Sequence, residues 1–136
     1  MQTSQLDDES AVKAVVVSFL TALGNDELDK VRALMLPNAN IAYFSTSDEK
    51  SIVTSINADQ FISQREGKQN RKFQEPVNQY TVSISQAKLA FVRADCTIFY
   101  DGNPSHHTSD FFVLMKDNAV WKILSGSYTA HPLETE

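Results

Sequence analysis

From residue 77 to residue 129 the chain is rich in β-branched and aromatic residues and has no convincing helical period. This composition favours strands, and the short polar breaks within it leave room only for tight turns. Because connections this short join antiparallel neighbours, the segment predicts three or four long antiparallel strands. We place these strands at 77–85, 88–100, 106–116 and 120–129, with turns at 85–88, 101–104 and 116–119.

The preceding residues carry helical patterns. Apolar residues at three- and four-residue spacing predict a first helix over residues 11–23 with one buried stripe. Asn25 or Asp26 can cap a second helix over 28–35, and Pro37 forbids its continuation. The two helices should form a short hairpin.

The stretch between the second helix and the strands is less regular. Residues 41–45 predict a brief strand, and the polar residues 46–51 predict a loop. A third helix is expected over residues 58–66, capped by Asn57 and closed by Gly67.

These patterns together predict an α+β fold in which three amino-terminal helices pack on one face of a strongly curved antiparallel sheet. At 136 residues the chain suits a single domain, 1–136, that buries a core without disulfides or metal. The lone Cys96 lies in a strand-like apolar run, which favours a buried small hydrophobe over a nucleophile.

The charge balance argues against a nucleic-acid partner, since 17 acidic and 12 basic residues give a net charge of -5. Basic residues gather only at Arg65, Lys68, Arg71 and Lys72, which we interpret as a solvated loop after the third helix. The amino terminus has no secretory pattern, and no apolar run approaches the ~20 residues of a membrane helix. We therefore expect a cytoplasmic protein without a membrane partner.

Alternation along the second long strand divides its side chains between two faces. Small apolar residues should pack under the helices; they are Ala90, Val92, Ala94, Cys96 and Ile98, together with Tyr100. The opposite face carries Phe91, Arg93 and Phe99 and suits either a homodimer contact or a plain solvent-facing surface.

The order of elements resembles the nuclear transport factor 2-like superfamily, a cone-shaped α+β fold. Local pieces carry the likeness over nearly the whole chain: residues 24–26 leading to 34 and 37–39, and the last hairpin, residues 107–116 and 121–125. These pieces resemble small bacterial members, some described as putative lumazine-binding and others similar to polyketide cyclases. The scaffold hosts isomerases, dehydratases, epoxide hydrolases, cyclases and structural dimerisation modules, so the resemblance indicates where a site would lie rather than its chemistry.

The resemblance implies a cavity between the helices and the concave sheet face. Enzymes of the superfamily hold a general base and a proton donor there, where burial raises a carboxylate pKa. The candidates for acid or base here are His106, His107 and Asp110. The residues expected to line the cavity or contact a ligand are Phe19, Tyr43, Phe61, Tyr100, Trp121 and Tyr128.

The turn at 117–118 decides which candidates point inward. His106 and Asp110 share one face of their strand, and His107 lies on the other. A two-residue turn would pair Leu114 with Trp121 and turn in the Asp110 set, whereas a four-residue turn would turn in the His107 set. The sequence leaves both registers open.

Two functions remain as hypotheses. The first is a pocket protein for a small apolar or aromatic molecule, with or without isomerase, dehydratase or cyclase-like activity. The second is a non-catalytic dimeric module that uses the exposed sheet face. Neither the histidines nor Cys96 stand at metal-ligand spacing, and no cofactor motif is present, so we expect no metal and no cofactor.

Overall fold

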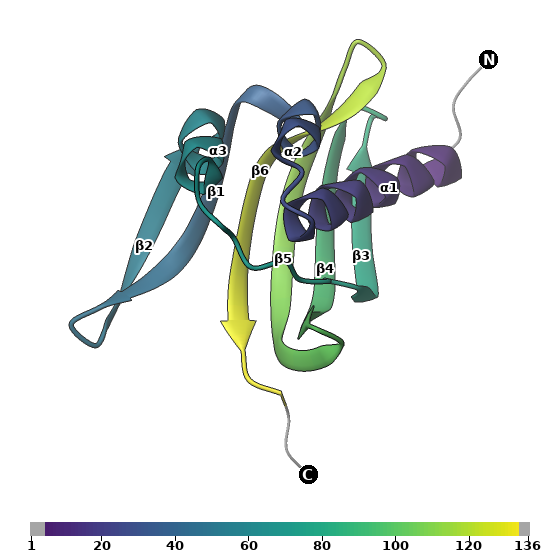
Figure 1. The fold of residues 1–136 in the computed structure, drawn as a ribbon. Helices are drawn as coiled ribbons and strands as arrows, with labels where there is room; N and C mark the ends of the chain where they lie inside the picture. The colour runs from purple at the N-terminus through teal and green to yellow at the C-terminus, as the bar shows by residue number, and fades with distance from the viewer. Residues whose placement is uncertain (1–4, 134–136) are drawn as a thin grey trace.

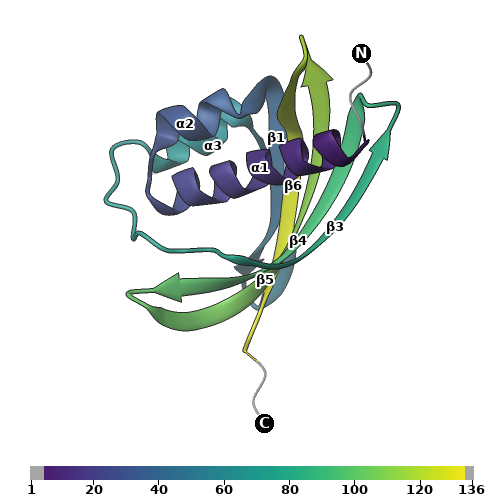
Figure 2. The same cartoon turned by 90° about the vertical axis from the view of Figure 1, so that its right-hand side faces the viewer.

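The computed structural model describes residues 5–133, except the side chains of residues 5, 6, 46 and 47. Three helices cover the concave face of a curved six-stranded sheet, which confirms the α+β fold class (Figure 1, Figure 2). The helices are α1 (Gln5–Gly24), α2 (Leu28–Ala33) and α3 (Ala58–Arg65). The strands are β1 (Met35–Ser47), β2 (Lys50–Asn57), β3 (Val77–Ser85), β4 (Leu89–Tyr100), β5 (Asn103–Asp117) and β6 (Val120–His131).

The strands lie in the order β2-β1-β6-β5-β4-β3. All neighbours are antiparallel except β1 and β6, which run parallel, so the sheet is mixed rather than wholly antiparallel. No tight turn joins β1 to β6, because they come from opposite ends of the chain, and their relative direction is therefore not constrained by a hairpin.

The four long carboxy-terminal strands are confirmed, and their turns lie where expected. Each of the sheet's four hairpin turns contains two consecutive residues of positive φ: Asp48-Glu49, Gln86-Ala87, Asp101-Gly102 and Asn118-Ala119. Positive φ at both central residues is the geometry whose twist matches that of paired strands.

The second helix differs from the expectation. It ends at Ala33, and β1 already begins at Met35 and continues through Pro37. Pairing of β1 with β6 is irregular between Met35 and Asn40, so the missing N–H of Pro37 interrupts no regular ladder there. The expected caps are also wrong, because Glu27 occupies the N-cap position and makes no side-chain capping bond.

The strand β2 was missed, because residues 46–51 were expected to form a loop. The chain instead turns at Asp48-Glu49 and pairs back on β1. All but one of the β2 side chains are at least partly exposed, so this strand lacks the apolar alternation that identifies a half-buried one. The third helix is confirmed: Asn57 accepts a hydrogen bond from Gln60 N, and the Gln60 side chain accepts one from Asn57 N.

The first helix begins earlier than expected, and a buried carboxylate anchors its first turn. Asp8 Oδ1 accepts hydrogen bonds from Lys116 Nζ at 2.9 Å and from Trp121 Nε1 at 3.0 Å. These bonds attach α1 to the β5–β6 hairpin. The bond from Lys116 is the main cause of the lowered pKa of Asp8.

The face of β4 expected to lie under the helices is buried from Ala90 to Ile98, and its last residue, Tyr100, is half-buried. No helix within residues 5–133 is long and apolar enough to cross a membrane.

Candidate functional site

A cavity of about 240 Å³ lies between the helices and the inner face of the sheet. Aromatic rings form much of its wall. The Phe19 ring of α1 stacks on Phe61 of α3, with centroids 6.4 Å apart, and meets Phe112 of β5 edge-on at 5.8 Å. An apolar wall of this kind favours flat organic ligands over ions.

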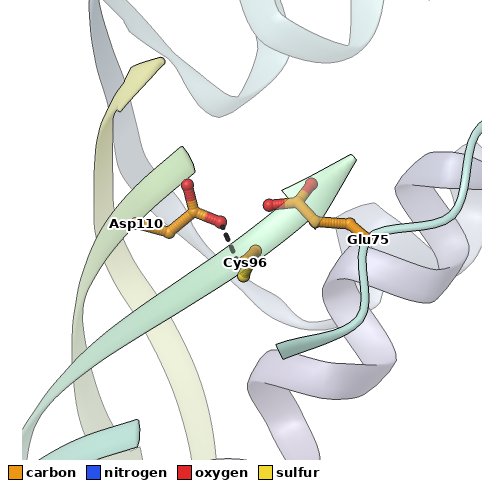
Figure 3. A group of neighbouring side chains, drawn as sticks. All are labelled: Glu75, Cys96 and Asp110. Atoms are coloured by element: carbon orange, nitrogen blue, oxygen red, sulfur yellow. Dashed lines mark hydrogen bonds between the residues drawn. The ribbon is translucent and has the colours of Figure 1, made fainter. Parts of the chain in front are cut away.

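Carboxyl groups interrupt this apolar wall. Glu75 and Asp110 both line the cavity, and the Cys96 thiol lies between them (Figure 3). Asp110 is 5% exposed, and its Oδ2 accepts a weak hydrogen bond from Cys96 Sγ at 3.6 Å. Thr108 Oγ1 donates to Glu75 Oε2 at 3.2 Å. Two carboxyl groups and a thiol therefore converge on one point.

The register of β5 places Asp110 on the inner face. Asp110 pairs with Ala94 of β4 and with Tyr128 of β6, and both it and Phe112 are buried. A two-residue turn at Asn118-Ala119 joins β5 to β6. The side chains that point inward are therefore those predicted for a two-residue turn, the set that contains Asp110. The pairing itself differs, because Trp121 lies opposite Lys116 rather than Leu114, on the same side of the strand.

Glu75 reaches the site from the irregular segment between α3 and β3. Its neighbour Gln74 exchanges two backbone hydrogen bonds with Phe99 of β4, at 3.0 and 2.8 Å. Its other neighbour, Pro76, accepts a bond from Thr97 N at 3.3 Å. Because both neighbours are held against β4, the intervening Glu75 side chain is directed at Cys96 and Asp110 (Figure 3).

Burial and the adjacent Asp110 change the ionisation of this group. Burial, followed by the hydrogen bond and the charge of Asp110, raises the pKa of Glu75 from its ordinary value of 4.5 to about 9. Burial also raises the pKa of the Cys96 thiol, and the Asp110 carboxylate raises it further. At neutral pH Glu75 is consequently a neutral carboxylic acid and Cys96 a neutral thiol.

Arg65 and Tyr128 also line the cavity. Burial raises the pKa of the Tyr128 phenol, as do Asp110 and Glu75, whereas the positive charge of Arg65 lowers it. Arg65 lies at the end of α3 rather than in a solvated loop, which corrects its interpretation; Lys68, Arg71 and Lys72 are exposed as expected.

The structure brings six of the nine candidate residues to the cavity wall. They are Phe19, Phe61, Tyr100, His106, Asp110 and Tyr128. The His106 ring is half-buried, and its Nδ1 is 3.0 Å from Ser105 Oγ.

Three candidates lie elsewhere. His107 is on the outer sheet face, with Nδ1 2.9 Å from Thr97 Oγ1 and its ring 5.7 Å from that of His131. Tyr43 stacks on Tyr128, with centroids 6.0 Å apart, but does not line the cavity. Trp121 also lies outside the cavity wall, and its Nε1 donates a hydrogen bond to Asp8. The two-residue turn explains the position of His107 on the outer face, because it directs the odd-numbered residues of β5 outward.

The donor atoms of Glu75, Cys96 and Asp110 lie within 4.8 Å of one another, close enough to share a metal ion. The prediction that the protein holds no metal considered only the histidines and Cys96 as ligands, and it did not consider the two carboxyl groups. Sequence reasoning missed Glu75 because it lies in an irregular segment, and it missed Arg65 because the basic residues from Arg65 to Lys72 were interpreted as a solvated loop. The one available indication was the position of Glu75 directly before Pro76 and β3.

The sequence of this chain matches a family model over residues 7–129, and that family is described as putative lumazine-binding. The chain belongs to this family. No curated protein matches it at a significant level.

Several solved structures have a fold similar to that of this chain. A nuclear transport factor 2-like protein of unknown function from Shewanella baltica is 17% identical, with a TM-score of 0.73, over 97% of this chain and 100% of that one. A protein of unknown function with a cystatin-like fold from Nostoc punctiforme is 12% identical, with a TM-score of 0.77, over 97% and 96%. The CaMKII hub of S. rosetta is 17% identical, with a TM-score of 0.69, over 90% and 95%. The nuclear transport factor 2-like fold is thus confirmed for this family member.

Proposed function

We propose that this protein binds a small cyclic or aromatic molecule in the cavity and transfers a proton within it, as an isomerase or dehydratase-like enzyme does. The convergence of Asp110 and Glu75 at the wall of an apolar cavity carries this proposal. The family description as lumazine-binding supports a flat heterocyclic ligand. A cavity of about 240 Å³ limits the ligand to one or two rings, since it is smaller than most drug-sized sites.

The pair suits a proton transfer because Glu75 keeps its proton at neutral pH and can act as a hydrogen-bond donor. The Asp110 carboxylate accepts a proton from a carbon next to a carbonyl group, and the C–H electron pair forms the new C=C bond. The carbonyl oxygen gains the negative charge and accepts a hydrogen bond from the neutral Glu75 acid. In a β,γ-unsaturated substrate the intermediate is a dienolate, and return of the proton from Asp110 to its γ-carbon yields the conjugated isomer and restores the protein.

Binding is tested first, by native mass spectrometry and calorimetry with lumazine and with 2-tetralone, a two-ring ketone. We expect either probe to bind and to shift the NMR signals of cavity residues such as Phe61. If neither probe binds in the cavity, the proposed function is wrong.

Proton transfer is tested by deuterium exchange at the carbon next to the 2-tetralone carbonyl, followed by NMR in D₂O. The protein should accelerate exchange, and Asp110→Asn should lose about 10²- to 10⁴-fold of that rate, because the amide cannot accept the proton. Asp95→Asn is the matched control, since Asp95 lies on the outer face with Arg93 and Ser109. Equal rates for the two variants would contradict the assignment of Asp110 as the base.

A dimeric interaction module is the second candidate function, and the outer sheet face favours it. Phe91 and Phe111 lie side by side there, with ring centroids 5.9 Å apart, and each is 37% exposed. Phe44 and Val53 of β1 and β2 are more exposed, at 58% and 68%. An apolar strip across several strands is typical of a subunit contact.

A further inference from the structure

Arg65 introduces a positive charge into an otherwise apolar and acidic cavity. It is the one arginine or lysine among the described residues that line this cavity. The Arg65 side chain is 23% exposed, and its Nε atom is buried. Desolvating a guanidinium without a good partner is costly, so its surroundings should reveal what it is positioned to bind.

The only carboxylate in ion-pair range of Arg65 among the described residues is a poor partner. Asp26 Oδ1 lies 3.7 Å from Arg65 Nε, which is beyond hydrogen-bond distance. The same Oδ1 accepts a hydrogen bond from Asn70 Nδ2 at 3.0 Å. Arg65 Nε is buried and has no hydrogen-bond acceptor within residues 5–133. An unpaired buried N–H of this kind is destabilising, and more so when the group is charged.

The other arginines of the chain are better satisfied or more exposed. Arg32 bonds Asp59 at 2.6 Å, and Arg93 bonds Asp95 at 3.2 Å and lies over the Phe111 ring. Arg71 is 67% exposed and stacks on Tyr100. Arg65 alone combines a cavity position with an unpaired, buried N–H among the described residues.

We infer that the ligand of this cavity is an organic anion, and that Arg65 binds its carboxylate or an equally planar oxyanion. This inference rests on the proposed binding function and names its substrate class. A guanidinium presents a planar set of N–H donors that matches a carboxylate, and Arg65 lines the cavity with no carboxylate of the described residues within hydrogen-bond distance. The ring of the ligand would lie against Phe19 and Phe61, within reach of Asp110.

The inference is tested by isothermal titration calorimetry with matched pairs of probes that differ only in charge. The pairs are benzoate with benzamide and 2-naphthoate with 2-naphthamide, which vary the ring size independently. We expect the carboxylate of at least one pair to bind wild-type protein about tenfold or more tightly than its amide. Equal binding of both members would overturn the inference and leave the proposed function standing.

Variants of Arg65 and Arg93 test whether Arg65 causes the preference for the carboxylate. Arg65→Gln should abolish the preference for the carboxylate, whereas Arg65→Lys should retain part of it, because lysine keeps the charge but not the planar donors. Arg93→Gln removes the same charge from the outer face and should leave the preference unchanged. A preference that survives Arg65→Gln in a folded protein overturns the inference. Failure of every probe, charged or neutral, to bind in the cavity overturns both the inference and the proposed function.

Discussion

At the scale of single residues, Glu75 dominates the electrostatics of the site. Its pKa is raised to about 9 by burial and by Asp110, so the folded protein holds this proton far more tightly than the unfolded chain does. The direction in which stability changes with pH follows from this difference in pKa. Below pH 4.5 both states are protonated, and between pH 4.5 and 9 the unfolded state gains by ionising. Glu75 therefore lowers the free energy of unfolding as the pH rises through this window.

Glu75→Gln removes this pH dependence, because the amide cannot ionise yet still donates a hydrogen bond toward Asp110. We expect the variant to match wild type near pH 4.5 and to exceed its stability by about 1–2 kcal/mol near pH 8.5, a value discounted for partial exposure. Urea denaturation at several pH values measures this difference. The exposed Glu66→Gln carries the same charge change as a control. Parallel pH profiles for wild type and Glu75→Gln would show that Glu75 is not neutral at pH 7.

At the scale of elements, the segment between α3 and β3 brings Glu75 to the site, and the end of α1 supports it. Phe73 N donates a hydrogen bond to Gly24 O at 3.1 Å. A Cβ atom on Gly24 would overlap the carbonyl oxygen of Phe73, a backbone atom that cannot rotate away. Glycine at this position lets the chain pass close to the helix two residues before Glu75.

Gly24→Ala should therefore displace the segment that carries Glu75. We expect a loss of about 1–3 kcal/mol, as for other forced overlaps, and weaker binding of any cavity ligand. Thermal unfolding and calorimetry with 2-tetralone measure the two effects. Ser18→Ala, on the exposed side of α1, is the control and should change neither. If Gly24→Ala kept full stability and binding, close packing of this segment on α1 would not position Glu75.

At the scale of the whole molecule, the helices cover one face of the sheet (Figure 2). The opposite face carries exposed aromatic rings. Arg93 lies over the Phe111 ring at 5.1 Å, at the centre of that face. A second copy of the chain packed here would bury Phe91 and Phe111 together. This arrangement would suit either candidate function, because it leaves the cavity on the other side of the sheet free.

Phe111→Asp should convert a dimer to a monomer, since an aspartate would be buried without a partner in the contact. Native mass spectrometry and light scattering at tens of micromolar protein measure the change. Val17→Asp places the same charge on an exposed apolar residue of α1 and should leave the dimer intact. A monomeric wild type at these concentrations would remove the outer face from both candidate functions.

Local patterns were sufficient for much of the fold. Alternation placed Ala90 to Ile98 on the buried face of β4, and turn chemistry located three of the hairpin turns. They failed for β2, whose side chains are nearly all exposed, and for α2, which ends before Pro37 is reached. Local patterns report burial, and an exposed strand or a helix ended by tertiary pairing leaves no such mark.

Patterns along the chain were enough to predict the fold class, the meander of long strands and the grouping of His106 with Asp110 on one strand face, because each depends on neighbouring residues. Three-dimensional packing was needed to establish that this face points inward, that Glu75 meets Cys96 and Asp110, and that Arg65 lines the cavity. These meetings join residues from α3, an irregular segment and two strands. They depend on how the elements pack, and no periodicity within one element encodes that.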